Sequence, residues 1–392
     1  MSEGPFIYIV AGEPSGDFLG GRLMAALKER TGGTVRFAGI GGAAMAAQGL
    51  QSRVPLADLA IMGVAEVLPR AATIFRHVRE TVADILAKNP DAVVTIDSSG
   101  FTWRVAHGLR RRGARVPLIH YVAPMVWAWR AGRARRMARW YDRLMALLPF
   151  EPPYFEAVGL SCHYVGHPVV ESGADRGDGP AFRRRHALAP DAKLLILLPG
   201  SRAGEVGRLL PIFRETVELL AARYPALVVA LPTTETVDAA VREGVKGFRV
   251  PVIVLADGAE KYDAFAAGDA ALAASGTVAL ELAMAKIPAV IAYRVNGLTH
   301  ALLRRIVTVK YANLVNLVLD RPAVPELLQD ECTPENLSIA LARLIDDPAA
   351  RAAQAASCEE ALHALGYGSF SPGLRAADDV LAVIAARAAR KE

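Results

Sequence analysis

Leu194-Leu-Ile-Leu-Leu-Pro-Gly-Ser-Arg-Ala-Gly-Glu205, just past the midpoint of the 392-residue chain, predicts a strand, a tight turn and a helix. The five apolar residues at its start have the length of a strand that is buried on both faces, and Pro199-Gly200 ends that strand. We expect Ser201 to be the N-cap of the helix that follows, with Glu205 about one turn in. A strand joined to a helix in this way is the building unit of a parallel α/β sheet.

The same stretch has the features of an anion site. Gly200 allows a tight turn, Ser201 precedes the N–H groups at the start of the helix, and the Arg202 side chain can reach over them. These features together suit phosphate, with Glu205 as an acid beside the site. An ordinary strand–helix joint remains the alternative, because every α/β protein contains several such joints.

The strand–helix pattern occurs in two runs, which predicts two α/β domains that are each large enough to be stable alone. Expected strands lie at residues 6–10, 35–38, 92–96, 117–122, 144–148 and 162–165 in the first run, and at 194–198, 227–231, 252–255, 270–273 and 289–293 in the second. We expect domains at 1–171 and 172–345, with ligands bound in a cleft between them.

Composition narrows the class of protein. The chain is 53% hydrophobic, and its three cysteines lack any C-x-x-C spacing, so we expect no metal set, no disulfide framework and a reducing, cytoplasmic location. We expect no signal peptide and no segment that spans a bilayer, because the sequence contains no apolar run of about 18 residues free of charge. The net charge of +5 is concentrated in one short segment that holds Arg130, Arg133, Arg135, Arg136, Arg139 and Arg143.

Two acids of the first run are candidate catalytic groups. Asp97 follows the strand at 92–96, and the carboxyl edge of a parallel sheet is where ligands bind. Its alternative role is to cap the helix that begins near Phe101. Glu13 lies in the turn after the first strand.

Gly39-Ile-Gly-Gly-Ala-Ala44 fits a loose dinucleotide pattern, but it follows the second strand rather than the first, so it only weakly indicates a nicotinamide cofactor.

A second turn in the C-terminal run complements the first. In Ala274-Ser-Gly-Thr-Val-Ala-Leu-Glu281, Ser275 and Thr277 can cap a helix and Gly276 allows close approach of a ligand. The Glu281 carboxylate suits the paired hydroxyls of a ribose. Together with Arg202, this turn predicts recognition of ribose and phosphate within one domain.

Trp127 and Trp129 lie beside the arginine-rich segment. Aromatic and cationic residues in this arrangement suit single-stranded nucleic acid or a membrane interface, and a solvated basic helix beside core tryptophans is equally compatible. Absent motifs narrow the chemistry further: we find no P-loop, no D-x-D and no G-x-S-x-G.

Several of these strings resemble the lipid-A-disaccharide synthase family, and the resemblance runs in order from about residue 6 to residue 340. They are Val10-Ala-Gly-Glu-Pro-Ser-Gly-Asp17, Tyr121-Val-Ala-Pro-Met-Val-Trp-Ala-Trp-Arg130, Leu198-Pro-Gly-Ser-Arg202, Ala274 to Glu281, Asn313-Leu-Val-Asn316 and Glu326-Leu-Leu-Gln329. The resemblance implies an inverting, metal-independent glycosyltransferase of the GT-B type without a cofactor. Such an enzyme has two Rossmann-like domains, and its C-terminal helices, here about 346–392, return to the first.

The resemblance also implies substrates and a location. The family joins UDP-2,3-diacylglucosamine to 2,3-diacylglucosamine 1-phosphate, which gives a β-1,6 disaccharide and UDP in lipid A synthesis at the cytoplasmic face of the inner membrane. Other readings are a different GT-B enzyme that acts on a UDP-sugar, such as an epimerase or a transferase with a soluble acceptor, and a non-catalytic nucleotide-sugar-binding homologue.

Matching positions assign roles to residues. Arg202 would stabilise the departing diphosphate, Glu281 would hold the ribose, and Asn316 would belong to the donor site. Asp97 matches the family's general base, with Glu13 as the alternative base or a ligand for a sugar hydroxyl. The sequence departs from the family's D-[AS]-P-D-F at Ser99 and Gly100, where proline and a second acid are absent.

Acylated substrates require a surface that contacts the bilayer and its anionic lipids, and the resemblance makes nucleic acid an unlikely partner. The expected membrane-facing residues are Ile61, Met62, Val64, Val67, Leu68, Ile74, Phe75, Trp127, Trp129, Arg135 and Arg136. A homodimer is a further option for the assembly.

Overall fold

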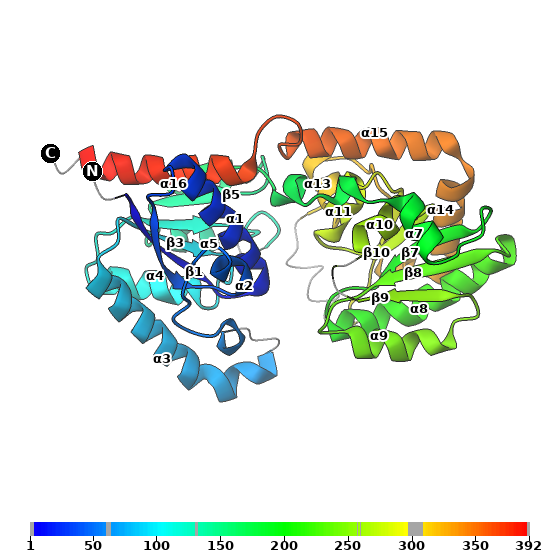
Figure 1. Ribbon diagram of the computed structural model, residues 1–392, viewed down its shortest axis with the longest axis horizontal. Coiled ribbons are helices and arrows are strands. Elements are labelled where there is room, and N and C mark those ends of the chain that lie inside the picture. Colours follow the sequence, from blue (N-terminus) through cyan, green and yellow to red (C-terminus); the bar gives the residue numbers. More distant parts are fainter. Residues whose placement is uncertain are drawn as a thin grey trace. The chain divides into compact units, whose positions relative to one another are not determined.

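The computed structural model describes residues 4–59, 64–129, 132–256, 258, 260–296 and 309–389. The chain forms two compact units, Met1–Pro168 with Gly368–Glu392, and Val169–Tyr367. Each unit contains one six-stranded sheet, with helices on both faces (Figure 1). Within the described ranges, no helix combines the length and the apolar content that crossing a bilayer requires.

The first unit contains an all-parallel sheet of order β2-β1-β3-β4-β5-β6. Its strands are β1 Phe6–Ala11, β2 Arg36–Ile40, β3 Ala92–Ile96, β4 Leu118–Tyr121, β5 Arg143–Ala146 and β6 Cys162–Tyr164. All six lie where apolar runs predict them, with ends shifted by one or two residues. Parallel strands are covered on both faces, so their sequences are nearly continuous apolar runs that are easy to recognise.

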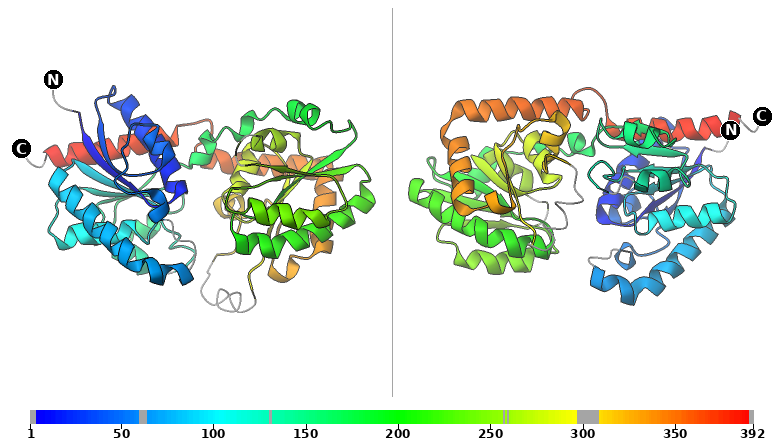
Figure 2. Two further views of the ribbon diagram at one scale, coloured as in Figure 1. Left: turned by 60° about the horizontal axis from the view of Figure 1, so that its bottom comes forward. Right: turned by 180° about the vertical axis from the view of Figure 1, so that it is seen from behind.

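Helices cover both faces of this sheet. They are α1 Pro14–Arg30, α2 Ala43–Ala46, α3 Val64–Lys88, α4 Thr102–Arg111, α5 Gly132–Met137, α6 Pro152–Glu156 and α16 Pro372–Ala389. Alternate residues of β1 separate the two layers: Ile7 and Ile9 pack with α1 and α16, whereas Tyr8 and Val10 pack with α3 and α4. α16 lies beside α1 although the two are far apart in sequence (Figures 1 and 2).

The second unit contains a parallel sheet of order β12-β11-β10-β7-β8-β9. Its strands are β7 Lys193–Leu198, β8 Leu227–Pro232, β9 Val252–Leu255, β10 Ala270–Ala274, β11 Ala289–Tyr293 and β12 Glu326–Leu328. β12 was not expected from the sequence. It is a three-residue edge strand that begins with a charged residue, so it lacks the apolar run that marks the other five.

The helices of the second unit are α7 Gly179–Arg185, α8 Ala203–Arg223, α9 Asp238–Gly244, α10 Lys261–Ala267, α11 Val278–Met284, α13 Leu314–Leu319, α14 Pro334–Asp346 and α15 Pro348–Ala364. α8 and α14 cover one face of the sheet through Phe213, Val217 and Leu341. Short 3-10 turns lie at Leu56–Asp58, Pro168–Glu171, Ala174–Arg176, Val245–Gly247 and Gln329–Glu331.

The C-terminal segment differs from the expectation. The chain changes units after Pro168, close to the predicted boundary at residue 171, and again after Tyr367 rather than near residue 345. α15 packs against α11 and α13 of the second unit, and the buried Gln354 side chain bonds both backbone groups of Ala289, at 2.7 and 3.0 Å. The segment from residue 346 to Tyr367 therefore belongs to the second unit, and α16 is the helix that packs on the first.

Candidate functional site

The strand order of each sheet reverses at one point, and the predicted turns lie there. In the first unit the reversal lies between β1 and β3, where Ala11 pairs with Ile96. In the second unit it lies between β7 and β10, where Leu198 pairs with Ala273. Ligands of open parallel sheets bind outside the carboxyl ends of strands at such points. Each unit therefore brings two of the predicted turns together.

In the first unit, Gly12 permits close contact between the turn after β1 and the turn after β3. A Cβ atom at Gly12 would lie 2.4 Å from Ser98 Oγ and 2.8 Å from Ser98 Cβ. Only glycine fits at this distance without displacing the Ser98 side chain. This contact holds residues 13–15 against the end of β3, where Asp97 begins the next turn.

Asp97 is half-buried at this junction, and Ser15 donates a side-chain hydrogen bond to its carboxylate. Burial raises the pKa of Asp97 above its ordinary value, and the hydrogen bonds from the Ser98 backbone and Ser15 oppose that shift. Asp97 and Ser98 have φ of +47° and +43°, a left-handed conformation that non-glycine residues rarely adopt. A strained, partly buried carboxylate at the carboxyl edge of a sheet can act as a general base.

The alternative role of Asp97 as a helix cap is not observed. The N-cap of α4 is Phe101, and this residue makes no side-chain capping hydrogen bond. The backbone carbonyl of Asp97 accepts a hydrogen bond from the Thr102 hydroxyl at 2.7 Å, which leaves the carboxylate outside the helix start.

Glu13 lies at the N-cap position of α1 with an exposed side chain that makes no capping hydrogen bond. Glu13 lies in the same turn as Ser15, which bonds the Asp97 carboxylate, so Glu13 and Asp97 lie at one edge of the sheet.

The loose dinucleotide pattern at residues 39–44 has a structural role. The buried Asp17 carboxylate accepts from the backbone N–H groups of Gly42, Ala44 and Met45, at 2.6, 2.9 and 3.1 Å. Those amides are therefore occupied within the first unit.

In the second unit, the turn after β7 differs from the prediction in its cap. α8 begins at Ala203 with Arg202 as its N-cap residue, and the exposed Ser201 side chain does not cap it. Gly200 adopts a φ of +116°, which requires glycine. The Glu205 carboxylate instead accepts from the Ser201 N–H at 3.3 Å and from Arg202 Nη1 at 3.0 Å. The Arg202 side chain is 73% exposed, so it can contact a ligand.

The turn after β10 is positioned by a different contact from the one expected. Ser275 does not cap α11, and its hydroxyl donates to the Ala312 carbonyl at 2.8 Å. Thr277 is at the N-cap position but makes no side-chain capping bond. Among the described residues, no atom lies within 4 Å of a Cβ built at Gly276, which leaves room for a ligand to approach the backbone.

Glu281 projects from the first turns of α11, and two residues of α10 hold its carboxylate. Lys261 Nζ donates to Oε2 at 2.6 Å and the Tyr262 hydroxyl donates to Oε1 at 3.1 Å. The group is thus oriented and its charge is compensated, while each oxygen keeps a further lone pair for a hydroxyl donor.

Asn316 is 1% exposed, and its amide is used within the second unit. Its nitrogen donates to the Val324 carbonyl at 2.8 Å and to Glu326 at 2.6 Å, and its oxygen accepts from the N–H groups of Ala323 and Val324, at 2.9 and 2.8 Å. Glu326 also accepts from the N–H groups of residues 312 and 313. Asn316 therefore holds the segment that Ser275 contacts, and a direct contact with the donor stays a prediction.

The expected membrane-facing set is only partly described. Ile61 and Met62 lie outside the described residues, and the side chains of Val64, Val67 and Leu68 in α3 do as well. Ile74 is 9% exposed and belongs to the core, so its assignment to the docking face is wrong. Phe75 is 56% exposed, and the Arg104 guanidinium lies 5.6 Å from the centre of its ring.

The two tryptophans of the segment differ in position. Trp127 is 8% exposed and its indole donates to the buried Glu151 at 3.1 Å, so it does not form part of a docking surface. Trp129 is half-buried, with the Arg133 guanidinium 4.6 Å from its ring centre. Arg135 and Arg136 are exposed on α5. The arginines can thus face a charged partner, but only one of the two indoles lies near them at the surface.

Some features of the site were not found from the sequence. An open pocket of about 550 Å³ beside Asp97 is lined by Ser99, Gly100, Trp103, Gly132, Arg133 and Arg136. Burial raises the pKa of Glu151 to about 7, against hydrogen bonds from Leu148, Trp127 and Leu147 that favour the ionised form. A proline-flanked acid at the start of a short helix gives no sign of such burial.

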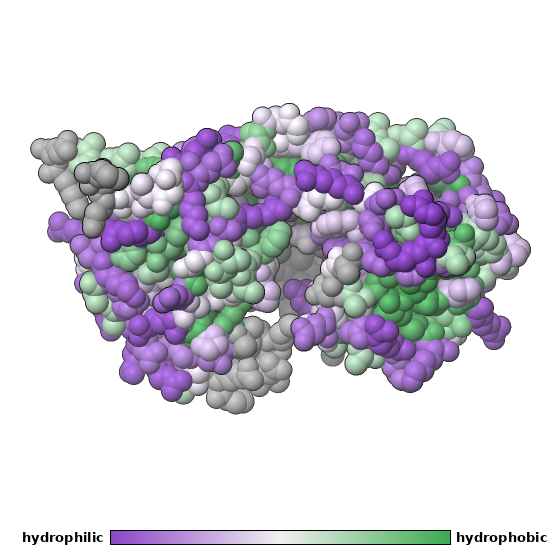
Figure 3. Space-filling view, viewed as in Figure 1, coloured by the Kyte–Doolittle hydropathy of each residue, from purple (hydrophilic) through white to green (hydrophobic). Residues whose placement is uncertain are grey.

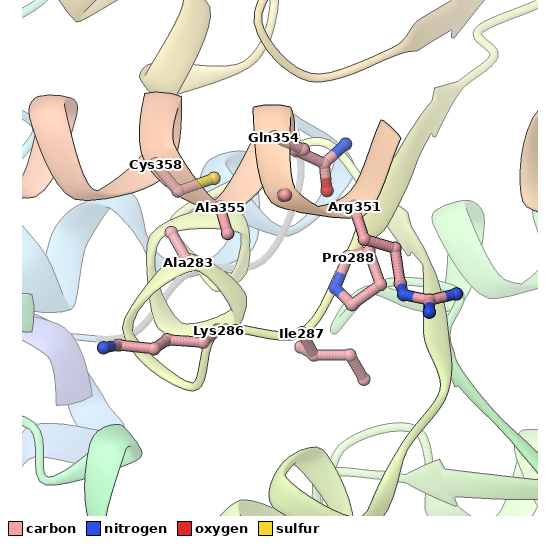
Figure 4. Close-up of a pocket in the computed structure, with 9 residues that line it drawn as sticks. Ala283, Lys286, Ile287, Pro288, Arg351, Gln354, Ala355 and Cys358 are labelled. Atoms are coloured by element: carbon pink, nitrogen blue, oxygen red, sulfur yellow. The ribbon is translucent and has the colours of Figure 1, made fainter. Parts of the chain in front are cut away.

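Two other surface features are not candidate sites. A cavity of about 260 Å³ between α11 and α15 contains Lys286 and Arg351, but these side chains point away from one another in Figure 4. In Figure 3, hydrophilic side chains gather over α7, the helix that ends in Arg183, Arg184 and Arg185. Arg183 pairs with Asp269 at 3.1 Å and Arg185 with Glu260 at 2.9 Å, which indicates a stabilising role.

Solved structures share this architecture. The chain is similar to the UDP-GlcNAc 2-epimerase from Neisseria meningitidis bound to UDP-GlcNAc, with a TM-score of 0.64 and 12% identity over 97% of this chain and 100% of that one. It is also similar to Acinetobacter baumannii MurG, with a TM-score of 0.57 and 14% identity over 97% and 100% of the two chains. At these identities the likeness establishes the GT-B fold.

Sequence relatives identify the family. A family model described as lipid-A-disaccharide synthetase matches residues 7–371. The lipid-A-disaccharide synthase of Rhodospirillum centenum is 59% identical over 381 residues, which cover 97% of this chain and 95% of that protein. With two parallel sheets and with its predicted turns at both reversal points, the chain belongs to the lipid-A-disaccharide synthase family, whose members are glycosyltransferases that form the lipid A disaccharide.

Proposed function

We propose that the chain transfers 2,3-diacylglucosamine from UDP to the 6-hydroxyl of 2,3-diacylglucosamine 1-phosphate. The products are the β-1,6 disaccharide 1-phosphate and UDP, and the anomeric carbon is inverted in a single displacement. Family membership supports the reaction class, and the position of Asp97 is the observation that carries the mechanism.

Asp97 is the proposed general base. The acceptor hydroxyl must lose its proton as its oxygen attacks the anomeric carbon, and a base with a raised pKa accepts that proton more readily. The Ser15 hydrogen bond orients the carboxylate, and the left-handed turn at Asp97 and Ser98 fixes its direction. Glu13 lies beside Ser15 in the turn after β1, at the same edge of the sheet as Asp97, so it can serve as a ligand for another hydroxyl of the sugar.

The second unit is the proposed donor site. The α8 start and Arg202 supply N–H groups and a cation for the diphosphate, so negative charge on the leaving group is stabilised without a metal ion. Glu281 accepts from the ribose hydroxyls, while Lys261 and Tyr262 hold it in position. The structure of the Neisseria epimerase contains bound UDP-GlcNAc, which supports a UDP-sugar as the donor class.

Both proposed substrates carry acyl chains, so the enzyme must work at a lipid surface. Phe75 supplies exposed apolar area, and Arg135 and Arg136 supply positive charge for anionic headgroups. Membership of the family supports a location on the inner face of the inner membrane, where the enzyme would be a peripheral protein.

The test is turnover of the purified protein with both acylated substrates in neutral detergent containing EDTA. Release of UDP together with a β-1,6 disaccharide supports the proposal, and Asp97→Asn should lower kcat by a factor of about 100 to 10,000. Asp191→Asn, at an exposed aspartate outside both turns, is the matched control and should keep full activity.

Other outcomes would contradict the proposal. Epimerisation of the UDP-sugar without an acceptor would indicate a different GT-B reaction, and turnover of unacylated substrates at equal rates would indicate a soluble acceptor. UDP binding without any turnover would indicate a non-catalytic homologue. Loss of activity in EDTA that returns with a divalent cation would contradict metal independence.

A further inference from the structure

The pocket beside Asp97 has a composition that suits an anion. Of the six residues that line it, Arg133 and Arg136 carry positive charge, Ser99 offers a hydroxyl, and none carries a carboxylate. Its volume of about 550 Å³ exceeds that of a phosphate group and is sufficient for a sugar phosphate. All six lining residues belong to the first unit, whereas the turns that we assign to UDP belong to the second.

The two arginines are held differently. The Arg133 guanidinium lies 5.6 Å from the ring centre of Trp103 and 4.6 Å from that of Trp129. A guanidinium that lies on aromatic faces keeps its N–H groups directed sideways, where they can form paired hydrogen bonds to phosphate oxygens. Arg136 is exposed, and its side chain has no hydrogen-bond or ion-pair partner in the described part of the chain.

A second observation concerns Trp103. This side chain is 8% exposed, packs edge-on against Trp140 with ring centres 6.3 Å apart, and lines the pocket. Its buried indole N–H has no hydrogen-bond partner among the described residues. Buried donors are normally paired, so an unpaired one in a pocket wall indicates that a ligand or ordered water belongs there.

Gly100 leaves the positive charge of the pocket without a compensating acid. The position holds an acid in the family pattern, whereas glycine here adds no negative charge. In the described part of the chain, Arg104 Nη1, at 3.9 Å, is the one atom within 4 Å of a Cβ built at Gly100. Arg104 also donates to the Gly100 carbonyl, which fixes the turn.

The wall of the pocket is near enough to Asp97, the proposed base, for one sugar to contact both. Ser99 is two residues after Asp97, so their Cα atoms are at most about 7.6 Å apart. In the acceptor, the ring oxygen lies between C1 and C5, and C5 carries the 6-hydroxymethyl group. If the 6-hydroxyl faces Asp97, a phosphate on C1 would therefore be near enough to reach the wall formed by Ser99 and Gly100.

We propose that this pocket binds the C1 phosphate of the acceptor, with Arg133 and Arg136 as its cationic ligands. The inference rests on the proposed function, because it takes Asp97 as the place where the 6-hydroxyl reacts. Binding of the phosphate on C1 positions the 6-hydroxyl of the same sugar, so these arginines determine which sugars serve as acceptors.

The experiment compares two acceptors, 2,3-diacylglucosamine 1-phosphate and the same lipid with a free C1 hydroxyl, in neutral detergent micelles that remove the influence of lipid charge. The wild-type enzyme should have a KM for the phosphorylated acceptor at least about tenfold lower than for the other. Arg136→Gln should raise the KM for the phosphorylated acceptor about tenfold while the KM values for the donor and for the C1-hydroxyl acceptor stay unchanged.

Arg139→Gln is the matched control, because Arg139 follows on the same segment and is exposed but does not line the pocket. It should leave the ratio of the two KM values unchanged. A readout independent of activity is tryptophan fluorescence, which glucosamine 1-phosphate should change in the wild type and not in Arg136→Gln, whereas glucosamine should have no effect.

The outcomes separate the two proposals. No turnover of either acceptor contradicts the proposed function, and a fluorescence response that requires Arg136 would still support the pocket. Turnover with equal KM values for both acceptors, or equal effects of Arg136→Gln and Arg139→Gln, contradicts the phosphate pocket and leaves the proposed function standing.

Discussion

Lys261 Nζ lies 2.6 Å from Glu281 Oε2, and this ion pair joins the start of α10 to the first turns of α11. Both side chains are largely shielded, with 29% and 20% of their areas exposed. The carboxylate proposed to hold ribose is therefore fixed before a ligand binds, and removal of the lysine would leave its charge uncompensated beside an anionic nucleotide.

Lys261→Met should weaken UDP binding about tenfold, because the uncompensated Glu281 charge repels the diphosphate and the carboxylate loses its orientation. Titration calorimetry with UDP measures the change. Lys246→Met is the matched control, since Lys246 forms an exposed pair with Glu243 at 2.5 Å. Equal affinities for the two variants would remove Glu281 and its partners from the donor site.

Arg202→Ala should weaken UDP binding about 10-fold to 100-fold, since a charge-assisted hydrogen bond to phosphate contributes about 1.5–3 kcal/mol. Arg223→Ala changes an arginine at the other end of α8 that pairs with Asp346, and it should leave the affinity for UDP unchanged. An Arg202→Ala protein that binds UDP as tightly as the wild type would exclude Arg202 from the phosphate site.

The pH dependence of kcat/KM should report Asp97. Because burial raises the pKa of this carboxyl, activity should fall on acidification at a higher pH than the ordinary pKa of an aspartate implies. The Ser15 hydrogen bond lowers that pKa, so Ser15→Ala should move the acid limb to still higher pH. Ser161→Ala, at an exposed serine before β6, should not move it. A limb that stays in place in Ser15→Ala would count against Asp97 as the base.

Glu151 should make stability depend on pH. The folded state retains the proton up to about pH 7, whereas the free carboxyl ionises near 4.5. The stabilisation is therefore complete below pH 4.5 and is lost as pH rises through 7, with a total of up to about 3 kcal/mol. In urea unfolding, the difference in unfolding free energy between the wild type and Glu151→Gln should fall from pH 5 to 8. The corresponding difference in unfolding free energy between the wild type and Glu156→Gln, a control on the exposed side of α6, should stay constant over this pH range.

Phe75 should contribute to binding of lipid surfaces. Insertion of one phenylalanine side chain is worth about 1.5–3 kcal/mol, so Phe75→Ser should lower co-sedimentation with anionic vesicles at least about tenfold. Phe18→Ser, at a phenylalanine of α1 that is 51% exposed and outside the expected docking set, is the control. If both variants bind vesicles like the wild type, α3 does not carry the docking surface at this position.

The strands and their turns could be predicted because both rest on local sequence. A strand that is covered on both faces is a continuous apolar run in the sequence. The turn after β7 needs glycine at position 200, because the backbone there has a positive φ. The predicted turns follow β1, β3, β7 and β10. Once the strand order is known, these turns mark the two points where that order reverses.

The side-chain partners could not be predicted, because they join residues that are distant in sequence. Asp17 bonds amides 25 to 28 residues away, and Glu151 bonds Trp127 at a separation of 24 residues. The predicted cap at Ser201 fails for a local reason: α8 begins one residue later than expected, with Arg202 as its N-cap residue, and the Glu205 carboxylate accepts from the Ser201 N–H. Burial of Trp127 and Ile74 likewise depends on which elements pack over them.

The return of α16 to the first unit has a consequence for the order in which the protein forms during synthesis. Residues 169–367 are continuous in sequence, so the second unit can fold as soon as they have left the ribosome. The first unit is made earlier but has to wait, because Ala376, Ala377 and Val380 complete the apolar layer over Ile7 and Ile9. Nascent chains that stop before α16 should therefore expose that layer to chaperones, although nearly all of the enzyme has already been made.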